Sequence, residues 1–444
     1  MRPRSNPGKR LFILSLDGVP CSFLKEGIAA GRFPNLGRLG EPVEIASTFP
    51  PVSSVAWATF STGVNPGRHG VFGFLELDRA TGAETIPTAA NLCSPTLWKM
   101  LNAQGKRTIV MNVPLTYPPQ ELDGIMISCF LCPDLARGVM PRSLLARLRR
   151  LDYRIEPDPS LAATDRGAYL GEILATLRAE RRVLFDLLPE PWDLFMAHIM
   201  MTDRMNHFFW QDGLDPKSEF HEAFLRFYRE VDELVGEVDR LLPADVEFFL
   251  LSDHGFSSVK AEVDLNALLA QEGYLCYGDG GAGLAGIARS SRAYSLIPGR
   301  VYLGRSGGNP SSHGTDAQER ATREDIRVLL SRLENGGGKR LLERVVLREE
   351  AYSGDCSSLA PDLVLLGSPG YDLKAKTSPG PVMAAPALRS GMHTYGDAFA
   401  LRRGGTLRPG GTILDATPTV FRLMGLPIPQ HLEGTSLLPS RSRR

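Results

Sequence analysis

Short runs of apolar residues, each closed by a polar or turn residue, recur along the chain. Both faces of such a run are hydrophobic, which is typical of a strand buried in a parallel sheet. The runs cover Leu11–Leu16, Arg107–Val113, Gly124–Ser128, Leu194–Ile199, Val246–Leu251 and Leu363–Leu366.

Segments with apolar residues at helical spacing separate these runs, most clearly Tyr169–Leu188 and His221–Leu242. Strands that alternate with helices predict an α/β fold, with a mostly parallel central sheet and helices on both of its faces. Ligands of such sheets gather at the carboxyl ends of the strands. Asp17, Asp203 and Asp253 each lie within a few residues of such an end, so we expect them to meet at one edge of the sheet.

The pattern changes between Asp253 and His393, where glycine-rich stretches interrupt it. We interpret this part as loops over Tyr277–Ser291 and Ser306–Thr315, a strand over Ala293–Leu303 and a charged helix over Arg323–Asn335. The sequence therefore predicts one catalytic domain over residues 11–439, with a small embedded cap at about 265–385. We expect residues 1–10 and 440–444 to be disordered tails.

The composition excludes several classes of protein. Among 444 residues, 50 acidic side chains balance 50 basic ones, so no net field favours a nucleic acid polymer or an anionic membrane. The apolar run before Asp17 is shorter than the ~7–15-residue core of a secretory signal, and no segment reaches the ~20 apolar residues of a membrane span. We therefore expect a cytoplasmic protein.

Six cysteines are scattered irregularly along the chain, unlike the framework of a disulfide-rich secreted protein. Cys129 and Cys132 form the one close pair. We interpret them as two small buried side chains. The alternative, half of a metal or redox site, lacks a second pair or a nearby histidine.

Aspartates and histidines occur together at three places in the chain. Asp203 and His207 are four residues apart, so on a helix they project from one face. Asp253 and His254 follow a strand directly, and His393 lies in a glycine-flanked loop. Each has a structural interpretation if taken alone, as a helix-dipole aspartate, a strand-end turn or a surface histidine.

Together with Asp17, these residues supply the mixed oxygen and nitrogen donors that suit Zn²⁺ or Mn²⁺. Carboxylates in this number also allow two ions ~3.5–4 Å apart, which can clamp the attacking and leaving oxygens of a displacement at phosphorus. The sequence therefore predicts a two-metal site.

A hydroxyl nucleophile would suit such a site, because a divalent cation lowers the pKa of a bound hydroxyl. The segment from Ser47 to Gly63 offers seven hydroxyls, and composition alone does not choose among them. A helix over Ser54–Ser61 would place Ser53 at its start, where the backbone N–H groups and the positive end of the helix dipole stabilise a phosphate.

Several motifs follow one another through nearly the whole chain. They are Asp17-Gly18; Ser53, with Thr62-Gly63 nine and ten residues later; Asn65-Pro66-Gly67-Arg68-His69-Gly70; Asp203 with His207; Asp253-His254-Gly255; His393 with Gly396; Ile413–Thr419; Gly425–Pro429; and Glu433–Leu437. In this order they resemble the alkaline phosphatase superfamily. The branch they resemble is the type I phosphodiesterase/nucleotide pyrophosphatase family, with its bacterial relatives described as predicted phosphohydrolases or phosphomutases.

The resemblance implies an alkaline-phosphatase-like fold and a metal-dependent hydrolase of phosphoric esters. It implies that Ser53 is the nucleophile and forms a seryl-phosphate, which water then cleaves. It also implies two divalent metal ions, Zn²⁺ with Mn²⁺ as the alternative. One would be bound by Asp17, Ser53, Asp253 and His254, and the other by Asp203, His207 and His393.

Two positions depart from the family pattern, and only the second bears on the substrate, because serine and threonine are both competent nucleophiles. Nucleotide phosphodiesterases usually carry threonine at the position of Ser53, and they have an asparagine where this chain has Phe74. We therefore expect weak or no preference for nucleotide diesters, and a small phosphorylated metabolite or a different diester as the substrate. We expect basic residues of the cap to hold a second phosphate or a polar leaving group: Arg289, Arg292, Arg300, Lys374 and Lys376.

Three alternatives remain open or can be set aside. A phosphomutase would need a second domain to present the acceptor. The segment from Ser53 to Asp203 is instead predicted to add strands and helices to the same sheet, which argues against a phosphomutase. A catalytically degenerate member would bind metal or a phosphorylated ligand without turnover. A sulfatase is disfavoured, because no Cys/Ser-x-Pro-x-Arg motif is present.

Overall fold

A computed structural model describes residues 9–77, 83–278, 283–304 and 316–439. The chain folds into two compact units, between which it passes several times. The first consists of Met1–Val64, Thr88–Phe256 and His393–Arg444, and the second of Asn65–Pro87 and Ser257–Met392. The predicted cap at about 265–385 lies within the last of these segments.

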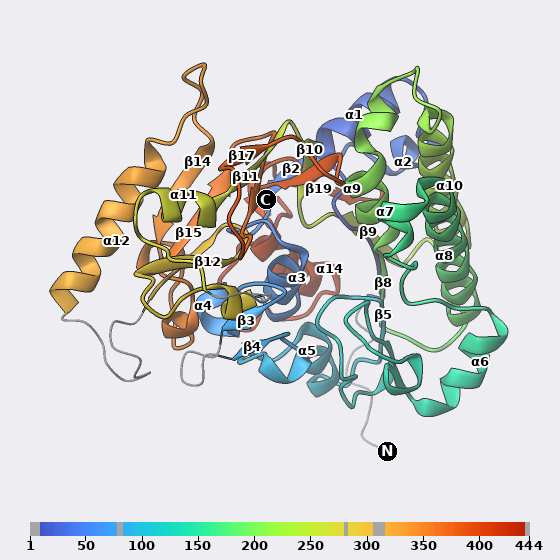
Figure 1. The fold of residues 1–444 in the computed structure, drawn as a ribbon. Helices are drawn as coiled ribbons and strands as arrows, with labels where there is room; N and C mark the ends of the chain where they lie inside the picture. Colours follow the sequence, from blue (N-terminus) through green and yellow to red (C-terminus); the bar gives the residue numbers. More distant parts are fainter. Residues whose placement is uncertain (1–8, 78–82, 279–282, 305–315, 440–444) are drawn as a thin grey trace. The chain divides into compact units, whose positions relative to one another are not determined.

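A nine-stranded sheet forms the centre of the first unit (Figure 1). Its strands, in spatial order, are β20 (Gly411–Thr412), β2 (Val43–Ala46), β19 (Ala398–Arg402), β9 (Glu247–Leu251), β1 (Leu11–Leu16), β8 (Leu194–Ile199), β5 (Thr108–Met111), β6 (Gly124–Ile127) and β7 (Val139–Met140). The five strands from β9 to β6 are mutually parallel. Their carboxyl ends therefore lie along one edge.

Strand β1 shows why this sheet is covered on both faces. Its side chains alternate between two separate hydrophobic cores: Phe12 and Leu14 belong to one, Leu11 and Ile13 to the other. All four side chains are fully buried, so the strand reads as a continuous apolar run rather than an alternating one.

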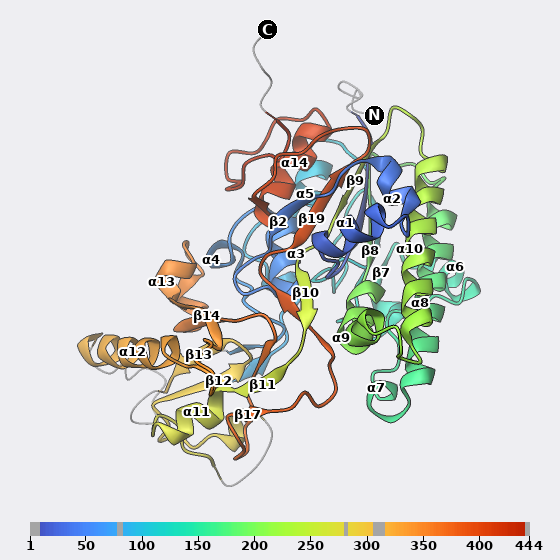
Figure 2. The same ribbon diagram turned by 90° about the horizontal axis from the view of Figure 1, so that it is seen from above.

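Helices cover each face of this sheet (Figure 2). On one face lie α1 (Cys21–Ala29), α2 (Pro34–Leu39), α8 (Arg166–Leu187), α9 (Met201–Leu214) and α10 (His221–Leu241). On the other lie α3 (Ser53–Thr62), α5 (Leu97–Ala103) and α14 (Ala416–Leu423). The short helices α6 (Leu145–Arg150) and α7 (Leu161–Thr164) complete this unit. The predicted mixed α/β fold is confirmed, with a large central sheet that is mostly parallel.

The second unit has its own hydrophobic core. One sheet contains β12 (Ala293–Ile297), β13 (Arg300–Leu303), β15 (Leu363–Gly367) and β14 (Leu342–Leu347), and another contains β16 (Tyr371–Lys374), β11 (Ala261–Asp264) and β17 (Met383–Ala384). Its helices are α4 (Pro66–His69), α11 (Leu265–Gln271), α12 (Asp316–Ser331) and α13 (Arg348–Ala351). Two short strand pairs are β3 (Glu76–Leu77) with β4 (Glu84–Thr85), and β10 (Gly255–Ser258) with β18 (Gly391–Thr394).

Three local predictions were wrong. The run at Leu363–Leu366 is a strand, but it pairs antiparallel with β13 and β14 and does not join the main sheet. The single strand predicted over Ala293–Leu303 is the hairpin β12–β13, because Pro298 and Gly299, with φ 76° at Gly299, turn the chain. The charged helix begins and ends earlier than predicted, at Asp316 and Ser331.

Other predictions fall outside the described residues. These are most of the predicted tails, at 1–8 and 440–444, the loop Ser306–Thr315, and residues 279–282 of the loop Tyr277–Ser291. Among the helices that are described, none combines the length and the apolar character needed to cross a lipid bilayer.

Candidate active site

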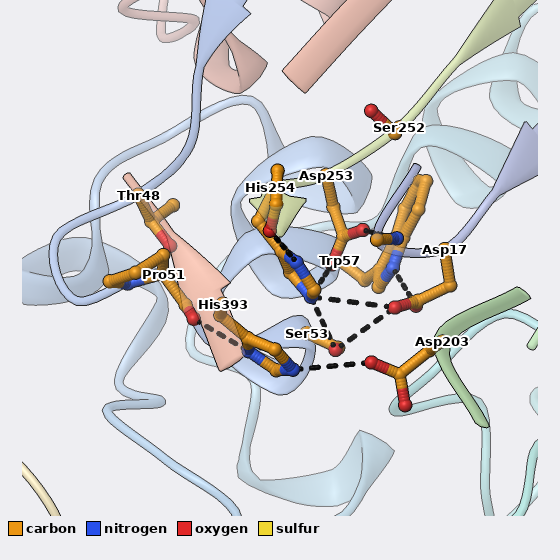
Figure 3. Close-up of polar contacts among 12 residues, drawn as sticks. Asp17, Thr48, Pro51, Ser53, Trp57, Asp203, Ser252, Asp253, His254 and His393 are labelled. Atoms are coloured by element: carbon orange, nitrogen blue, oxygen red, sulfur yellow. Dashed lines mark hydrogen bonds and ion pairs between the residues drawn. The ribbon is translucent and has the colours of Figure 1, made fainter. Parts of the chain in front are cut away.

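The predicted site residues all belong to the first unit, and four of the seven follow strands at the carboxyl edge of the main sheet. Figure 3 shows six of them side by side: Asp17, Ser53, Asp203, Asp253, His254 and His393. Asp17 follows β1, Asp253 and His254 follow β9, and Asp203 lies in the first turn of α9, which follows β8. These strands are adjacent and parallel, so chain-distant acids meet at one edge.

One group forms around Ser53, the first residue of α3. The Ser53 hydroxyl donates to Asp17 Oδ1 at 3.3 Å and lies 3.2 Å from His254 Nε2. His254 Nε2 lies 3.5 Å from Asp17 Oδ1 and 3.4 Å from Asp253 Oδ2. Asp17, Asp253 and His254 are fully buried. The hydroxyl therefore sits within a cluster of carboxylate and imidazole donors.

A second group forms around Asp203. Its Oδ1 lies 3.3 Å from His207 Nε2 and 3.1 Å from His393 Nε2. The two imidazole nitrogens are themselves 2.9 Å apart. As predicted from their spacing of four, Asp203 and His207 project from one face of the helix α9. His393, which is 186 residues from His207 in sequence, completes the group.

The backbone orients two of these histidines in the same way. His393 Nδ1 lies 2.9 Å from the Pro51 carbonyl oxygen, and His254 Nδ1 lies 3.1 Å from that of Gly255. A carbonyl only accepts, so each Nδ1 carries the proton and donates it. In the neutral ring Nε2 is then left with a lone pair directed into the cluster, which is the tautomer of a metal-binding histidine.

Electrostatics in the cluster are strongly perturbed. Burial and the charge of Asp17 raise the pKa of Asp253, and burial together with His254 lowers the pKa of His393. Burial would raise the pKa of Asp203, but His207 and His393 outweigh it, and the net pKa is lowered. These shifts are opposed because burial disfavours every charged form, while neighbouring charges of opposite or like sign stabilise or destabilise it.

The donor set fits divalent cations. Asp203, His207 and His393 offer ligand atoms within 4.8 Å of one another, and so do Asp17, Asp203 and His254. Asp253 Oδ2 is buried and accepts no hydrogen bond from the described residues. Two imidazole nitrogens that face each other at 2.9 Å, and a buried carboxylate oxygen without a hydrogen bond, are an arrangement that a cation relieves.

The sequence interpretation missed two residues that contact this site. Trp57 donates its indole N–H to Asp17 Oδ2 at 2.9 Å, and His198 Nε2 lies 3.1 Å from the same oxygen. A histidine inside the apolar run Leu194–Ile199, and a tryptophan four residues after Ser53, were the available signals. Both side chains are fully buried.

The motif from Asn65 to Gly70 lies in the second unit, where it has a structural role. Asn65 Oδ1 accepts from Gly67 N at 2.9 Å, which caps α4, and its Nδ2 donates to the Ser353 carbonyl at 2.9 Å. His69 is fully buried, and its Nδ1 accepts from Val71 N at 3.2 Å. These contacts make His69 a packing residue of this turn.

The five basic residues expected at the substrate also lie in the second unit. Arg300 is buried, with its guanidinium beside Gly73. Lys374 and Lys376 both pair with Glu262, at 3.6 and 3.4 Å. Arg292 stacks over a tyrosine ring, while Arg289 is exposed.

Comparisons with solved structures show the class of fold. Phosphonoacetate hydrolase from Sinorhizobium meliloti 1021, in complex with phosphonoformate, aligns over 94% of this chain and 96% of its own, with a TM-score of 0.62 and 17% identity. Human ectonucleotide pyrophosphatase/phosphodiesterase 5 aligns over 96% and 97%, with a TM-score of 0.59 and 13% identity. The fold is therefore that of the alkaline-phosphatase-like enzymes.

The family is shown by the sequence itself. A family model described as type I phosphodiesterase/nucleotide pyrophosphatase matches residues 11–396. The chain belongs to this family, and is thereby an enzyme of the phosphoric ester hydrolase type. The predicted resemblance is confirmed. A search of curated proteins found no match.

Proposed function

We propose that this protein hydrolyses phosphoric esters with Ser53 as its nucleophile and two divalent metal ions, Zn²⁺ or Mn²⁺, as cofactors. The observation that carries the proposal is the position of the Ser53 hydroxyl, 3.3 Å from Asp17 Oδ1 and 3.2 Å from His254 Nε2. A hydroxyl buried among metal-binding donors is where an activated nucleophile belongs.

The residues would divide into two ligand sets. Asp17, Ser53, Asp253 and His254 would hold one ion, and Asp203, His207 and His393 the other. When bound, such cations lower the pKa of the serine hydroxyl and neutralise the charge that develops on the departing oxygen. Placement at the start of α3 adds the positive end of the helix dipole beneath the phosphoryl group.

The reaction has two steps in this proposal. Ser53 Oγ forms a bond to phosphorus while the ester P–O bond breaks, which leaves a seryl-phosphate and frees the alcohol. Water then attacks phosphorus, the bond to Ser53 Oγ breaks, and the phosphorylated product leaves. Both steps need the serine held in line with phosphorus, which the first turn of a buried helix can do.

The test is the activity of Ser53→Ala on p-nitrophenyl phosphate and bis(p-nitrophenyl) phosphate, with Zn²⁺ or Mn²⁺ supplied. We expect kcat to fall by about 10³-fold or more, since loss of the nucleophile removes the covalent route. Ser54→Ala is the matched control, because Ser54 is also buried on α3 and its hydroxyl has no hydrogen-bond partner among the described residues. Full activity in Ser53→Ala would overturn the proposal.

We also propose a small phosphorylated substrate other than a nucleotide diester. Phe74 supports this, since it occupies the position at which nucleotide phosphodiesterases carry a polar asparagine. The measurement is kcat/KM for a dinucleotide diester against simple phosphate esters. We expect no advantage for the nucleotide. An advantage of about 100-fold, or ~2.7 kcal/mol of transition-state binding, would contradict this part of the proposal.

A phosphomutase is the second candidate, and one observation favours it. The chain has a second compact unit with its own core, which a mutase needs in order to present an acceptor. The two reactions differ in product: a hydrolase releases the phosphoryl group to water, whereas a mutase returns it to another position of the same molecule. Phosphate release from a sugar phosphate, measured alongside phosphorus NMR of the sugar, separates them.

A further inference from the structure

The two oxygens of Asp17 have different surroundings. Oδ1 faces Ser53 and His254, in the proposed metal site. Oδ2 faces away from them, toward Trp57 and His198, neither of which belongs to either ligand set. The carboxylate is fully buried, so these protein groups are what fixes its rotation.

Trp57 links this carboxylate to the nucleophile. It lies four residues after Ser53 on α3, so both side chains project from one face of the helix. Ser53 reaches Asp17 Oδ1 and Trp57 reaches Oδ2, the latter by an indole N–H bond of 2.9 Å. One helix therefore holds both ends of the carboxylate, and any rotation of Asp17 would break a bond to it.

His198 approaches the same oxygen from the sheet. It lies in β8 beside Ser15 of β1 in the parallel register, and its Nδ1 is 3.0 Å from the Ser15 hydroxyl. Its Nε2 is 3.1 Å from Asp17 Oδ2, which is ion-pair distance, and it makes no hydrogen bond of regular geometry with any described residue. The Ser15 hydroxyl also donates to the Ala197 carbonyl at 3.3 Å. A carboxylate oxygen only accepts, so the His198 tautomer that stabilises Asp17 is the one protonated at Nε2. The His198 ring also packs edge-on against Trp57, with centroids 4.7 Å apart.

We propose that Trp57 and His198 are positioning residues, which hold Asp17 Oδ2 so that Asp17 presents only Oδ1 to the cation shared with Ser53 and His254. The inference rests on the proposed function. Partners beyond the direct ligands commonly set a ligand's orientation, and their loss weakens metal affinity or activity ~10–100-fold. Because Trp57 shares a helix with Ser53, it would also set the distance between nucleophile and ligand.

The experiment compares Trp57→Phe, His198→Leu and His198→Gln with the wild-type protein. The dissociation constants of bound Zn²⁺ are measured by competition with a chromogenic chelator, and kcat and KM with p-nitrophenyl phosphate. We expect Trp57→Phe and His198→Leu to weaken one of two Zn²⁺ sites ~10–100-fold and to lower kcat with little change in KM. His198→Gln keeps an N–H donor and should recover part of the loss.

Trp98→Phe is the matched control. Trp98 is also buried in the first unit, and it donates its indole N–H to Gln120 at 2.9 Å, away from Asp17. It should lose a comparable hydrogen bond without a change in Zn²⁺ affinity. Melting temperatures identify any variant that fails to fold. If His198→Leu does not fold, Ser15→Ala takes its place, because it removes the hydroxyl that contacts the His198 ring and is a smaller change.

The outcomes separate the two proposals. Folded Trp57→Phe and His198 variants with wild-type Zn²⁺ affinity and kcat would overturn the positioning role and leave the proposed function standing. An equal loss of Zn²⁺ affinity and kcat in Trp98→Phe would also overturn the positioning role, because the effect would then come from a general loss of stability. A wild-type protein that binds no Zn²⁺ or Mn²⁺ would overturn both.

Discussion

His69 and His393 show that burial alone does not give a histidine its role. His393 directs Nε2 toward Asp203 and His207, and its Nδ1 is committed to a backbone carbonyl. His69 instead uses Nδ1 as an acceptor, from the N–H of Val71. What distinguishes them is which nitrogen faces other functional groups, and a neighbouring backbone atom decides that in each case.

The acceptor role of His69 predicts a loss of stability in acid. Burial lowers its pKa from 6.5 to about 3. A depressed pKa means that the unfolded chain takes up a proton at a pH where the folded protein does not. The stabilising contribution is therefore present above pH 6.5 and is lost as the pH falls toward 3, by on the order of 2 kcal/mol at pH 5.

His69→Asn tests this, because the asparagine Oδ1 can still accept from Val71 N but does not titrate. Free energies of unfolding in urea, measured from pH 7.5 to pH 5, should fall more steeply for the wild-type protein than for the variant. Parallel curves would show that His69 does not contribute to the acid sensitivity.

At the scale of elements, the helix α3 carries both the nucleophile and a partner of Asp17, so its ends matter. Gly63 follows its last residue, with φ at 67° and a backbone N–H that donates to the Thr59 carbonyl at 2.8 Å. A Cβ at Gly63 would lie 2.5 Å from Leu432 Cδ2. Glycine is required there both for the left-handed conformation and for space.

We expect Gly63→Ala to destabilise the protein by about 2–5 kcal/mol, the sum of the costs of a left-handed backbone and of an overpacked contact. Gly105→Ala is the matched control. Gly105 has φ 71°, but no atom lies within 4 Å of the position that a Cβ would take. Its alanine variant should therefore show the cost of the left-handed backbone alone, about 1–2 kcal/mol. Equal losses in urea unfolding would mean that the Leu432 contact relaxes without cost.

At the scale of the whole molecule, the first unit gathers three buried aspartates at one sheet edge, Asp17, Asp203 and Asp253. Such a site is stabilised by any cation that it binds, by RT ln(1 + [L]/Kd), or about 2.7 kcal/mol at a hundredfold excess over Kd. We therefore expect exhaustive chelation to lower the melting temperature and abolish activity. Zn²⁺ or Mn²⁺ should restore both, and Ca²⁺ should not.

Asp253→Asn provides the control for this prediction. Burial and Asp17 raise the pKa of Asp253. In the metal-free protein, stability is therefore lost as the pH rises from the unfolded value of 3.8 through the folded one. Asparagine removes this penalty, so the metal-free variant should be more stable than the metal-free wild type at pH 9, although inactive. An unchanged melting temperature of the wild-type protein after chelation would contradict the proposed metal sites.

The sequence by itself determined the five parallel strands of the main sheet, the order of the motifs and the candidate site residues that follow strand ends. Leu11–Leu16 and Leu194–Ile199 were predicted with the bounds they have, because a strand buried on both faces must be apolar throughout. Asp17 and Asp253 could be placed at one edge, because parallel strands end on the same side of a sheet.

The tertiary structure alone decided which neighbours each site residue has. His198 lies in an apolar strand, and nothing local distinguishes it from a packing residue. Its contact with Asp17 exists only because β8 pairs with β1 in register. In the same way, β15 is apolar like the central strands but pairs antiparallel in the second unit. Local sequence patterns indicate whether a segment is buried and whether it is a helix or a strand. Which strands pair is set by contacts between residues that are distant in the chain.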